Sequence, residues 1–317
     1  MKERLNSEEL SRRLGVRPPL LMLDRLSVDA EAGRAEGLKL VSMDECHFVG
    51  HFPGQPVMPG VLQVGLMCQS SVALFQSGGL VGADGVAVVT GVRRVKFRVP
   101  VRPGMRLESE CVRGEELPDG SVEYTVKNLA DGQLASSGTV TVASRPAAAW
   151  YAESAEAEGV SALPAEVASG SHLEVSELMG RLPHRYPFLL VDRAYGLADV
   201  REVWGLKNVT CGGTYAMAVT PSEFAGYLQV ECGAQLGCAA LLSRPENAGK
   251  LAFFMSIDSA TFHAPVRPGD QLVMCMRSDV KGRYGMAEGR LYVGSRLVTE
   301  MAIKFAIVSQ EEAAGGK

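Results

Sequence analysis

The chain carries the same sequence pattern twice, and this repeat constrains its fold more than any other feature. The hexapeptide LLMLDR at residues 20–25 returns as FLLVDR at residues 188–193. The pentapeptide PVRPG occurs at 100–104 and again at 265–269, and DGQLASS at 131–137 aligns with GSRLVTE at 294–300. Because the three matches keep the same order, the sequence predicts two tandem domains of one fold.

The repeats set the expected domain boundaries. We place an N-terminal domain at residues 1–143, a linker at 144–172 and a C-terminal domain at 173–317. The linker is rich in Ala, Ser, Glu, Pro and Gly and has no clear strand pattern, and this composition is compatible with a short helix.

Each copy has a glycine- and proline-rich loop, then one long apolar segment, then several alternating segments. The first apolar segment predicts a helix from Pro59 to about Gln76, with Gly78 beyond its end. In the second copy, TPSE at 220–223 has the pattern of a capping box and predicts a helix to about Ser243. Both helices are apolar on nearly all sides, which indicates burial, and the later segments alternate as antiparallel strands do. The expected fold is α+β, with a buried helix wrapped by an antiparallel sheet in each domain.

Composition narrows the class of protein. The 317 residues are 46% hydrophobic with a net charge of −4, which is typical of a soluble globular protein and disfavours general nucleic-acid binding. No apolar run is long enough to span a membrane and the N-terminus is polar, so we expect a cytoplasmic protein. The seven cysteines contain no C-x-x-C pair and are expected to be reduced and mostly buried.

Two residues suggest chemistry. His51 lies in the loop GHFPGQPVMPG, and Glu231 lies on the second helix among apolar neighbours. A buried ionised carboxylate costs several kcal/mol unless it is paired or protonated. Aligning the helices by their shared G-x-L-Q-V pattern places Glu231 on Gly65 and His51 on Met217. Each copy therefore keeps one half of a histidine and carboxylate pair.

At these residues the sequence resembles the FabZ-type 3-hydroxyacyl-(acyl carrier protein) dehydratases, which carry an H-F-P-G-x-P-x-M-P-G-V-L-Q loop and a helix glutamate 14 residues after the histidine. Further segments look like the same family: LPHRYPFLLVDR (182–193), KNVT (207–210), APVRPGDQL (264–272) and LVTEMAIKFAIV (297–308). The chain is also similar to the double hot-dog dehydratase domains of polyketide and polyunsaturated fatty acid synthases. The resemblance implies a double hot-dog fold that forms a pseudo-dimer.

The resemblance also implies the site. His51 of the first copy would face Glu231 of the second, giving one composite site per chain, and the backbone N–H of Gly60 would bind the thioester oxyanion. The opposite site, with Met217 and Gly65, would be degenerate. The predicted capping box would also bury the amide of Gly226 inside its helix. The residues expected to form the substrate loop are Phe52, Pro53, Gly54 and Pro59.

The implied reaction converts a (3R)-hydroxyacyl thioester into a trans-2-enoyl thioester, in fatty-acid-like or polyketide-like biosynthesis. His51 suits the base that removes the C2 proton, and a buried Glu231 is expected to be protonated and to assist the leaving hydroxyl. No metal or redox cofactor is expected. The substrate would be carried on the phosphopantetheine of an acyl carrier protein or on coenzyme A, with the acyl chain in an apolar tunnel between the copies.

Other interpretations stay open from the sequence. A hot-dog thioesterase would use a helix carboxylate to activate water, although the intact H-F-P-G loop disfavours it. A non-catalytic acyl-binding or scaffold subunit is a third class, because each copy alone lacks one catalytic residue. Isomerase activity is less expected, since related isomerising dehydratases usually carry Asp at the helix position. Cys46, His47 and His51 lack the further ligands of a metal site.

The basic segment of residues 92–102 has two interpretations. It is either a solvated strand face or a contact surface for an acidic carrier protein or its phosphate. Asp24 and Asp192, which recur at matching positions, are expected to be structural. Further association of the pseudo-dimers is compatible with the sequence. The candidate carrier contacts are Arg93, Arg94, Lys96, Arg98 and Arg102.

Overall fold

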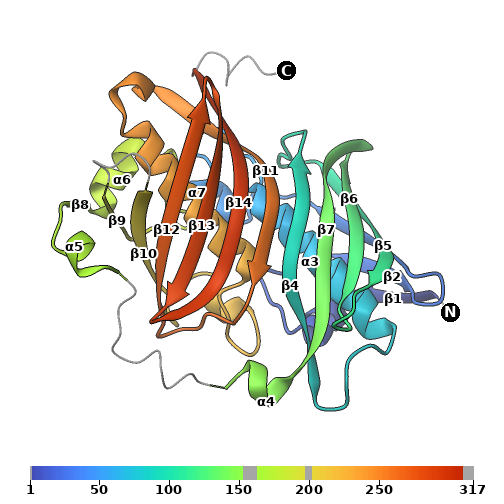
Figure 1. The fold of residues 1–317 in the computed structure, drawn as a ribbon. Coiled ribbons are helices and arrows are strands. Elements are labelled where there is room, and N and C mark those ends of the chain that lie inside the picture. The colour runs from blue at the N-terminus through green and yellow to red at the C-terminus, as the bar shows by residue number, and fades with distance from the viewer. Residues whose placement is uncertain (1, 153–162, 197–201, 310–317) are drawn as a thin grey trace.

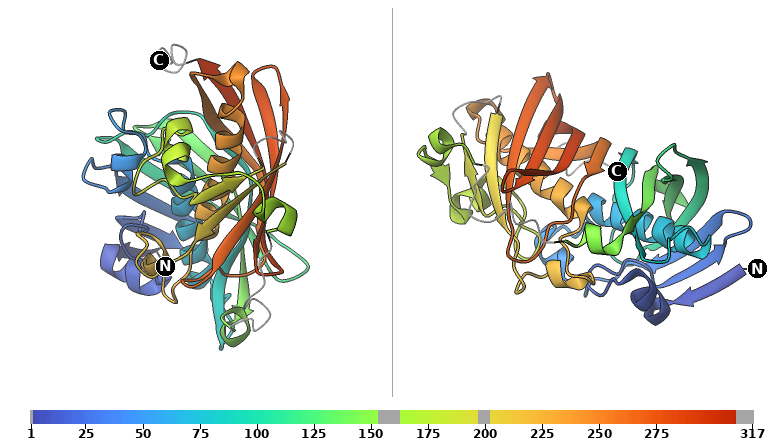
Figure 2. Two further views of the ribbon diagram at one scale, coloured as in Figure 1. Left: turned by 90° about the vertical axis from the view of Figure 1, so that its left-hand side faces the viewer. Right: turned by 60° about the horizontal axis from the view of Figure 1, so that its bottom comes forward.

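The computed structural model describes residues 2–152, 163–196 and 202–309, so the expected linker is described except for 153–162. Its fourteen strands form one antiparallel sheet in the order β1-β2-β3-β5-β6-β7-β4-β11-β14-β13-β12-β10-β9-β8. Figure 1 shows the long helices α3 and α7 packed behind this sheet, and the two further views in Figure 2 show how the sheet curves around them. This is the expected α+β double hot-dog.

The strands divide equally between the two repeats. Those of the first half are β1 (Lys2–Asn6), β2 (Arg25–Asp29), β3 (Arg34–Leu40), β4 (Gly85–Phe97), β5 (Arg106–Glu116), β6 (Val122–Ala130) and β7 (Gln133–Pro146). Those of the second half are β8 (His172–Leu173), β9 (Arg193–Tyr195), β10 (Glu202–Asn208), β11 (Lys250–Phe262), β12 (Gln271–Lys281), β13 (Tyr284–Val293) and β14 (Arg296–Ser309).

The helices follow the same division. The first half has α1 (Ser7–Leu14), α2 (His47–Gly50) and α3 (Gly60–Ser77). The second half has α6 (Val175–Arg181), α7 (Gly226–Leu242) and the 3-10 helices η2 (Ala216–Ala218) and η3 (Pro245–Asn247). Between them lie the short helices α4 (Ala147–Trp150) and α5 (Ala165–Ala168), within the segment expected to be a linker.

The two halves join at β4 and β11, which pair antiparallel with Val95 opposite Ile257 and Val92 opposite Ala260. The strand order reads the same outward from this junction: β7, β6, β5, β3, β2 and β1 on one side, and β14, β13, β12, β10, β9 and β8 on the other. The chain thus folds as a pseudo-dimer with one continuous sheet (Figure 1).

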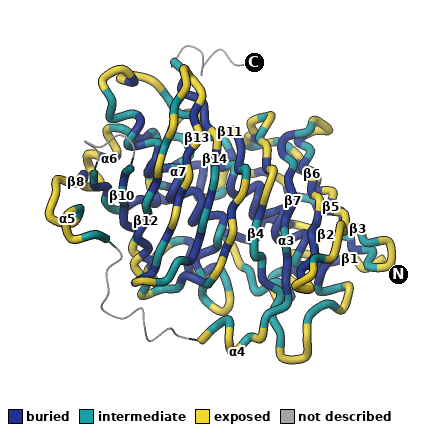
Figure 3. The backbone as a smooth tube through the Cα atoms, in the orientation of Figure 1, coloured by how far each residue is buried: buried dark blue, intermediate teal, exposed yellow. Residues whose placement is uncertain are grey.

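Helices α3 and α7 are buried nearly all round, as their apolar sequences predict (Figure 3). Both begin at a glycine where the sheet leaves no room for a side chain. A Cβ on Gly60 would lie 2.9 Å from the ring of Phe97, and one on Gly226 would lie 2.6 Å from the ring of Phe262. The helix axes therefore approach the junction strands closely, which brings the two helix N-termini near the border between the repeats.

The predicted capping box at 220–223 is wrong. Helix α7 begins at Gly226 with Ala225 as its N-cap, in register with α3. Thr220 does not cap this helix, because its N–H donates to the carbonyl of Gly15 and its hydroxyl accepts from Arg17 of the first repeat. Contacts with the other repeat thus override the local capping signal, and Gly226 stands at a helix start, not inside the helix.

One glutamine in each long helix fixes the segment that precedes the outer strands. Gln69 accepts from the N–H of Met22 and donates to the carbonyl of Leu20, at 2.9 and 2.6 Å. Gln235 makes the same pair of bonds to Leu190 and Phe188, at 2.9 and 2.8 Å. Since all these groups are buried, each glutamine satisfies backbone atoms that water cannot reach.

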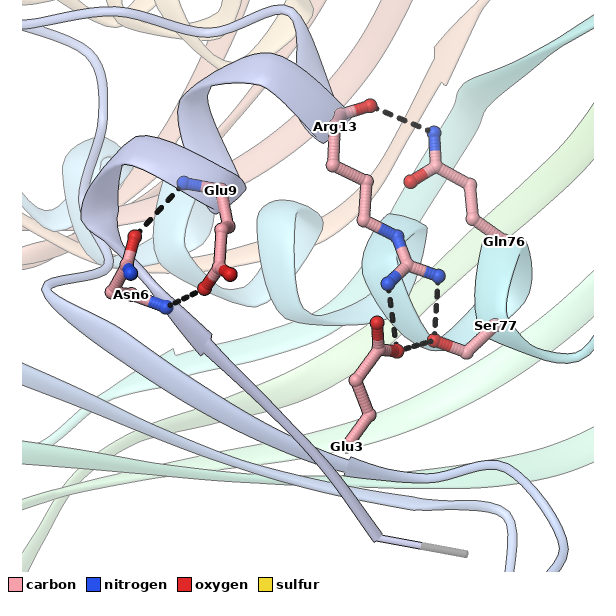
Figure 4. A network of polar contacts seen from close by, with 6 residues as sticks. All are labelled: Glu3, Asn6, Glu9, Arg13, Gln76 and Ser77. Atoms are coloured by element: carbon pink, nitrogen blue, oxygen red, sulfur yellow. Dashed lines mark hydrogen bonds and ion pairs between the residues drawn. The ribbon is translucent and has the colours of Figure 1, made fainter.

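The N-terminal segment is tied to the end of α3 by polar contacts (Figure 4). Asn6 and Glu9 form a reciprocal capping box at the start of α1. Arg13 at the other end of α1 bonds to Glu3 and to the hydroxyl of Ser77. These contacts fix the N-terminal edge of the sheet to the central helix.

We predict that Gln69→Leu lowers the free energy of unfolding by roughly 2–4 kcal/mol, because it leaves a buried N–H and a buried carbonyl without partners. Chemical denaturation followed by circular dichroism measures the loss. Gln133→Leu, at an exposed strand end, is the control and should change stability little. Equal stability of the two variants would show that these buried bonds contribute nothing net.

Candidate active site

His51 lies directly after α2, at the start of the loop that leads into α3. Its Nδ1 is 2.7 Å from the carbonyl oxygen of Val57, and the N–H of Val57 donates back to the carbonyl of His51. Since a carbonyl only accepts, Nδ1 carries the proton and Nε2 presents a lone pair. The ring stacks on Phe52 at 3.9 Å between centroids and meets the edge of Phe188 at 5.4 Å. The histidine is therefore held in one tautomer and one orientation.

Glu231 lies on α7 and is 5% exposed. The side-chain amide of Gln235, one turn later, donates to its Oε1 at 2.9 Å, and Nε2 of His184 lies 3.5 Å from the same oxygen. Within the described residues, both donors approach Oε1 and none approaches Oε2. That second oxygen is therefore the one free to accept from a bound molecule.

His184 connects the two predicted catalytic residues. It is 8% exposed, its ring centroid lies 5.5 Å from that of His51, and its Nε2 faces Glu231. His51 of the first repeat and Glu231 of the second thus meet around one histidine, which makes the site composite. His184 and Gln235 are not among the site residues predicted from the sequence. The repeat itself carried a signal for His184, because the offset from LLMLDR to FLLVDR places it on the apolar Val16.

Electrostatics fix the resting charges of the site. Burial, reinforced by the charge of His184 and opposed by Glu231, lowers the pKa of His51 to about 4. Burial raises the pKa of Glu231, but hydrogen bonding and charge from His184, the charge of His51 and the bond from Gln235 outweigh it and leave the pKa below its usual value. At neutral pH the site therefore holds a neutral imidazole and a carboxylate. The expectation of a protonated Glu231 is wrong, because it considered burial without these donors.

The loop expected to contact substrate closes on itself beside His51. Phe52 and Gln55 exchange two backbone hydrogen bonds, and Gly54 between them has a φ of 77°, a conformation that favours glycine. Pro53 lies in this turn, and Pro59 is the N-cap of α3. The N–H of Gly60, as the first residue of the helix, has no partner within the helix and suits an oxyanion.

The loop of the second repeat pairs differently from the sequence alignment. In the first repeat the carbonyl of Gly50 accepts from the N–H of Arg185, and in the second the carbonyl of Ala218 accepts from Arg17. The residue after each acceptor is His51 in one case and Val219 in the other. Val219, not Met217, is thus the structural counterpart of His51, and Met217 is 46% exposed. The alignment failed because the second loop is shorter between this point and the helix.

The second site also lacks room for an acid at position 65. A Cβ on Gly65 would lie 3.0 Å from the ring of Tyr227 on α7 and 3.3 Å from its hydroxyl oxygen. The residue that corresponds to Tyr227 on α3 is Val61, which is much smaller. The tyrosine thus fills the space that a carboxylate would need. Beside it, the guanidinium of Arg267 lies 5.3 Å above the ring of Tyr151, which follows α4.

The predicted carrier contacts are not equivalent in their surroundings. Arg93 forms an ion pair with Glu123, while Arg94 and Arg98 donate to hydroxyls of β7. Lys96 and Arg102 are exposed and form no ion pair with another described residue. Of these five residues, Arg102 is tied to the site, because the carbonyl of the preceding Val101 accepts from Met58 of the His51 loop at 2.8 Å.

Asp24 and Asp192 have matching structural roles, since each carboxylate accepts from a backbone N–H, that of Leu40 or Asn208. No group of three His, Cys, Asp or Glu side chains placed to hold a metal occurs in the described part of the chain. None of the described helices is both long enough and apolar enough to cross a membrane.

Two tandem hot-dog domains that share one histidine and carboxylate site define a fused pseudo-dimer in which each repeat supplies one half. The model of the FabA-like domain matches residues 14–138 and again 182–302. The chain therefore belongs to the FabA-like domain family and contains that domain twice.

Curated relatives match one repeat at a time. The chain is 42% identical over 138 residues to the 3-hydroxyacyl-[acyl-carrier-protein] dehydratase FabZ of Pelotomaculum thermopropionicum, covering 43% of this chain and 99% of the relative. It is 43% identical over 141 residues to FabZ of a Roseiflexus species, covering 44% and 99%.

Solved structures match both repeats together. The dehydratase domain from the CurJ module of the curacin polyketide synthase superposes with a TM-score of 0.64 at 14% identity, over 92% of this chain and 97% of that one. The dehydratase domain of RzxB from Pseudomonas fluorescens gives 0.58 at 16% identity, over 90% and 98%. At these identities the likeness concerns the double hot-dog fold alone.

We predict that Gly50→Ala weakens the site by pushing the two repeats apart. A Cβ at this position would overlap the carbonyl oxygen of Arg185, so the His51 loop could no longer pack against the segment that carries His184. The expected result is a lower unfolding temperature together with loss of most activity. Gly180→Ala in α6, where a Cβ meets nothing within 4 Å, is the control. Unchanged stability and activity in Gly50→Ala would contradict the prediction.

Proposed function

We propose that this protein dehydrates (3R)-hydroxyacyl thioesters to trans-2-enoyl thioesters at the composite site formed by His51 and Glu231. The observation that carries the proposal is the resting arrangement of these residues: a neutral imidazole with its Nε2 lone pair available, beside a carboxylate with one free oxygen. The curated relatives named above are 3-hydroxyacyl-[acyl-carrier-protein] dehydratases, which agrees with this reaction.

The reaction begins with proton removal from C2. Nε2 of His51 takes this proton, and the Val57 carbonyl stabilises the imidazolium through the Nδ1–H bond. The electron pair of the broken C–H bond moves toward the thioester carbonyl, where charge develops on oxygen. The N–H of Gly60 at the start of α3 is the donor for that oxygen.

The second half of the reaction expels the hydroxyl group from C3. Glu231, ionised at rest, accepts a hydrogen bond from this hydroxyl through Oε2 and stabilises the neighbouring imidazolium. When the C3–O bond breaks, the imidazolium returns its proton to the departing oxygen and water leaves. The electron pair on C2 forms the double bond to C3, so atoms and charges balance and both side chains return to their resting states.

We predict that His51→Ala and Glu231→Gln each lower activity by roughly 10²–10⁴-fold, the contribution of a positioned proton-transfer group. The assay is hydration of a short trans-2-enoyl thioester, followed by loss of enoyl absorbance. Val219→Ala, which changes the counterpart of His51 in the second repeat, should retain activity.

The outcomes separate the competing functions. Inactivity of the wild-type chain on carrier-protein and coenzyme A substrates alike would refute the dehydratase and favour an acyl-binding subunit. Release of free thiol from acyl thioesters, dependent on Glu231, would indicate a thioesterase instead.

We also propose that an acyl carrier protein presents the substrate and that Arg102 contacts its phosphopantetheine phosphate or acidic surface. Arg102 is exposed and follows Val101, which is hydrogen-bonded to the His51 loop. Its counterpart beside the second site, Arg267, is already engaged by the carbonyl of Trp150 and the ring of Tyr151. The remaining basic residues of this surface are Arg93, Arg94, Lys96 and Arg98.

We predict that Arg102→Glu raises KM for a carrier-protein substrate roughly tenfold or more, because reversed charge repels an acidic partner. KM for a short thioester without carrier or phosphate should stay unchanged. Lys281→Glu, at the exposed end of β12, makes the same charge change away from the His51 loop and serves as the control. If both variants raise KM equally, the effect is due to net charge, and Arg102 has no specific role.

A further inference from the structure

His184 is a further polar group of the site, and it has no part in the chemistry described so far. It comes from the segment after α6 in the second repeat, whereas His51 comes from the first. Arg185 fixes this segment, since its backbone N–H donates to the carbonyl of Gly50 and its guanidinium donates to the carbonyls of Leu182 and His184 at 2.7 Å. The position of the His184 ring is therefore set by contacts with both repeats.

The two ring nitrogens of His184 have different surroundings. Nε2 lies 3.5 Å from Oε1 of Glu231, while Nδ1 is buried and has no hydrogen-bond partner among the described residues. A proton on Nδ1 would be buried without a hydrogen-bond partner, and it would leave a bare nitrogen facing the carboxylate. The proton therefore belongs on Nε2. In this tautomer His184 donates to Glu231, and the edge of Phe52 packs against its ring at 5.1 Å between centroids.

The second site gives an internal comparison. There Val16 stands where His184 stands in the first, and that site also lacks the carboxylate, because Gly65 replaces Glu231. The glutamine that bonds to Glu231 is kept in both helices, since Gln69 and Gln235 have the same backbone partners. The glutamine thus has a structural role independent of the acid. At this position a histidine therefore accompanies the carboxylate, and a valine stands where the carboxylate is absent.

We propose that His184 is a positioning residue that holds Oε1 of Glu231 and so turns its Oε2 toward the substrate hydroxyl. The proposal rests on the dehydration mechanism for its effect on rate, and on the contacts of Oε1 for its physical basis. Oε1 contacts both His184 and Gln235, so rotation of the carboxylate would break both contacts at once. Loss of His184 leaves one donor and frees the carboxylate to rotate and to take up a proton.

Other charged or titratable groups face this cluster and remain in every variant. His51 lies on the loop side, Tyr215 stands before η2 with Cys46 near its hydroxyl, and Cys232 and Cys238 follow Glu231 along α7. The pKa values of Tyr215, Cys232 and Cys238 are all raised by burial, so these groups are neutral near pH 7. A change in the pKa of Glu231 on substitution of His184 can therefore be attributed to His184, because the charges of these other groups do not change.

Two substitutions separate hydrogen bonding from packing. His184→Phe keeps an aromatic ring and removes the donor, while His184→Gln keeps a donor near the position of Nε2 and removes the ring. We expect His184→Phe to lower kcat roughly 10-fold to 100-fold, the range for losing one hydrogen bond to a charged group, with little change in KM. His184→Gln should stay within a few-fold of wild type. Val16→Ala, at the counterpart position, is the control.

The pH profile gives a readout that a packing role would not move. His184 lowers the pKa of both Glu231 and His51, so its removal raises both. Both variants remove the charge that acts on His51, but only His184→Phe also removes the donor to Glu231. Since activity requires ionised Glu231 and neutral His51, the acid limb of kcat/KM should lie at higher pH in His184→Phe than in His184→Gln. Equal losses and equal acid limbs in the two variants would overturn the proposal.

A measurement without turnover keeps the test independent of the proposed function. The side-chain carboxyl ¹³C signal of Glu231, assigned with Glu231→Gln, reports its pKa directly in wild type and in His184→Phe. A higher pKa in the variant supports the positioning role even if the protein proves not to be a dehydratase, and an unchanged pKa overturns it. The double variant His184→Phe/Glu231→Gln should be no slower than Glu231→Gln alone, because His184 acts through the carboxylate.

Discussion

The pairing of β4 with β11 is the interaction on which the rest of this structure depends. It joins the sheets of the two repeats into one, with buried Val95 opposite Ile257 at the junction. Because α3 and α7 pack against these strands through Gly60 and Gly226, the same junction sets the distance between the two helix N-termini. The loop that carries His51 is then close enough to reach the segment that carries His184 and the helix that carries Glu231. A site of this kind cannot form within one repeat.

Because both repeats lie in one chain, the two sites need not carry the same residues, as they must in a symmetric dimer. At the positions of His51, Glu231 and His184 the second site has Val219, Gly65 and Val16. Tyr227 fills the space beside Gly65, so α7 packs against α3 where an acidic side chain would otherwise lie. The other site holds His51 from the first repeat and Glu231, His184 and Gln235 from the second.

The resting charge of Glu231 is set against burial by its donors, whereas the neutral state of His51 follows from burial. Glu231 is 5% exposed, and burial alone would raise its pKa and favour the protonated carboxyl group. Two donors from separate elements, Gln235 on α7 and His184 after α6, reverse that direction and leave a carboxylate. His51 is neutral and its Nδ1 proton is fixed by the carbonyl of Val57, so its Nε2 presents a lone pair to the site. The proposed mechanism depends on this arrangement, because there one histidine transfers the proton in both steps.

The sequence by itself determined the tandem repeat, the α+β double hot-dog fold and the pair of candidate catalytic residues. Periodicity and repeated segments are local properties, and His51 and Glu231 stand out because a loop histidine and a helix acid among apolar neighbours are visible without coordinates. Only the tertiary structure decided the rest. Thr220 forms no cap because Arg17 and Gly15 of the other repeat bind it, and Val219 replaces Met217 as counterpart of His51 because backbone pairing sets the register. The charge of Glu231 was likewise decided by His184, which lies 47 residues earlier in the chain (231 − 184) and meets it only in the folded protein.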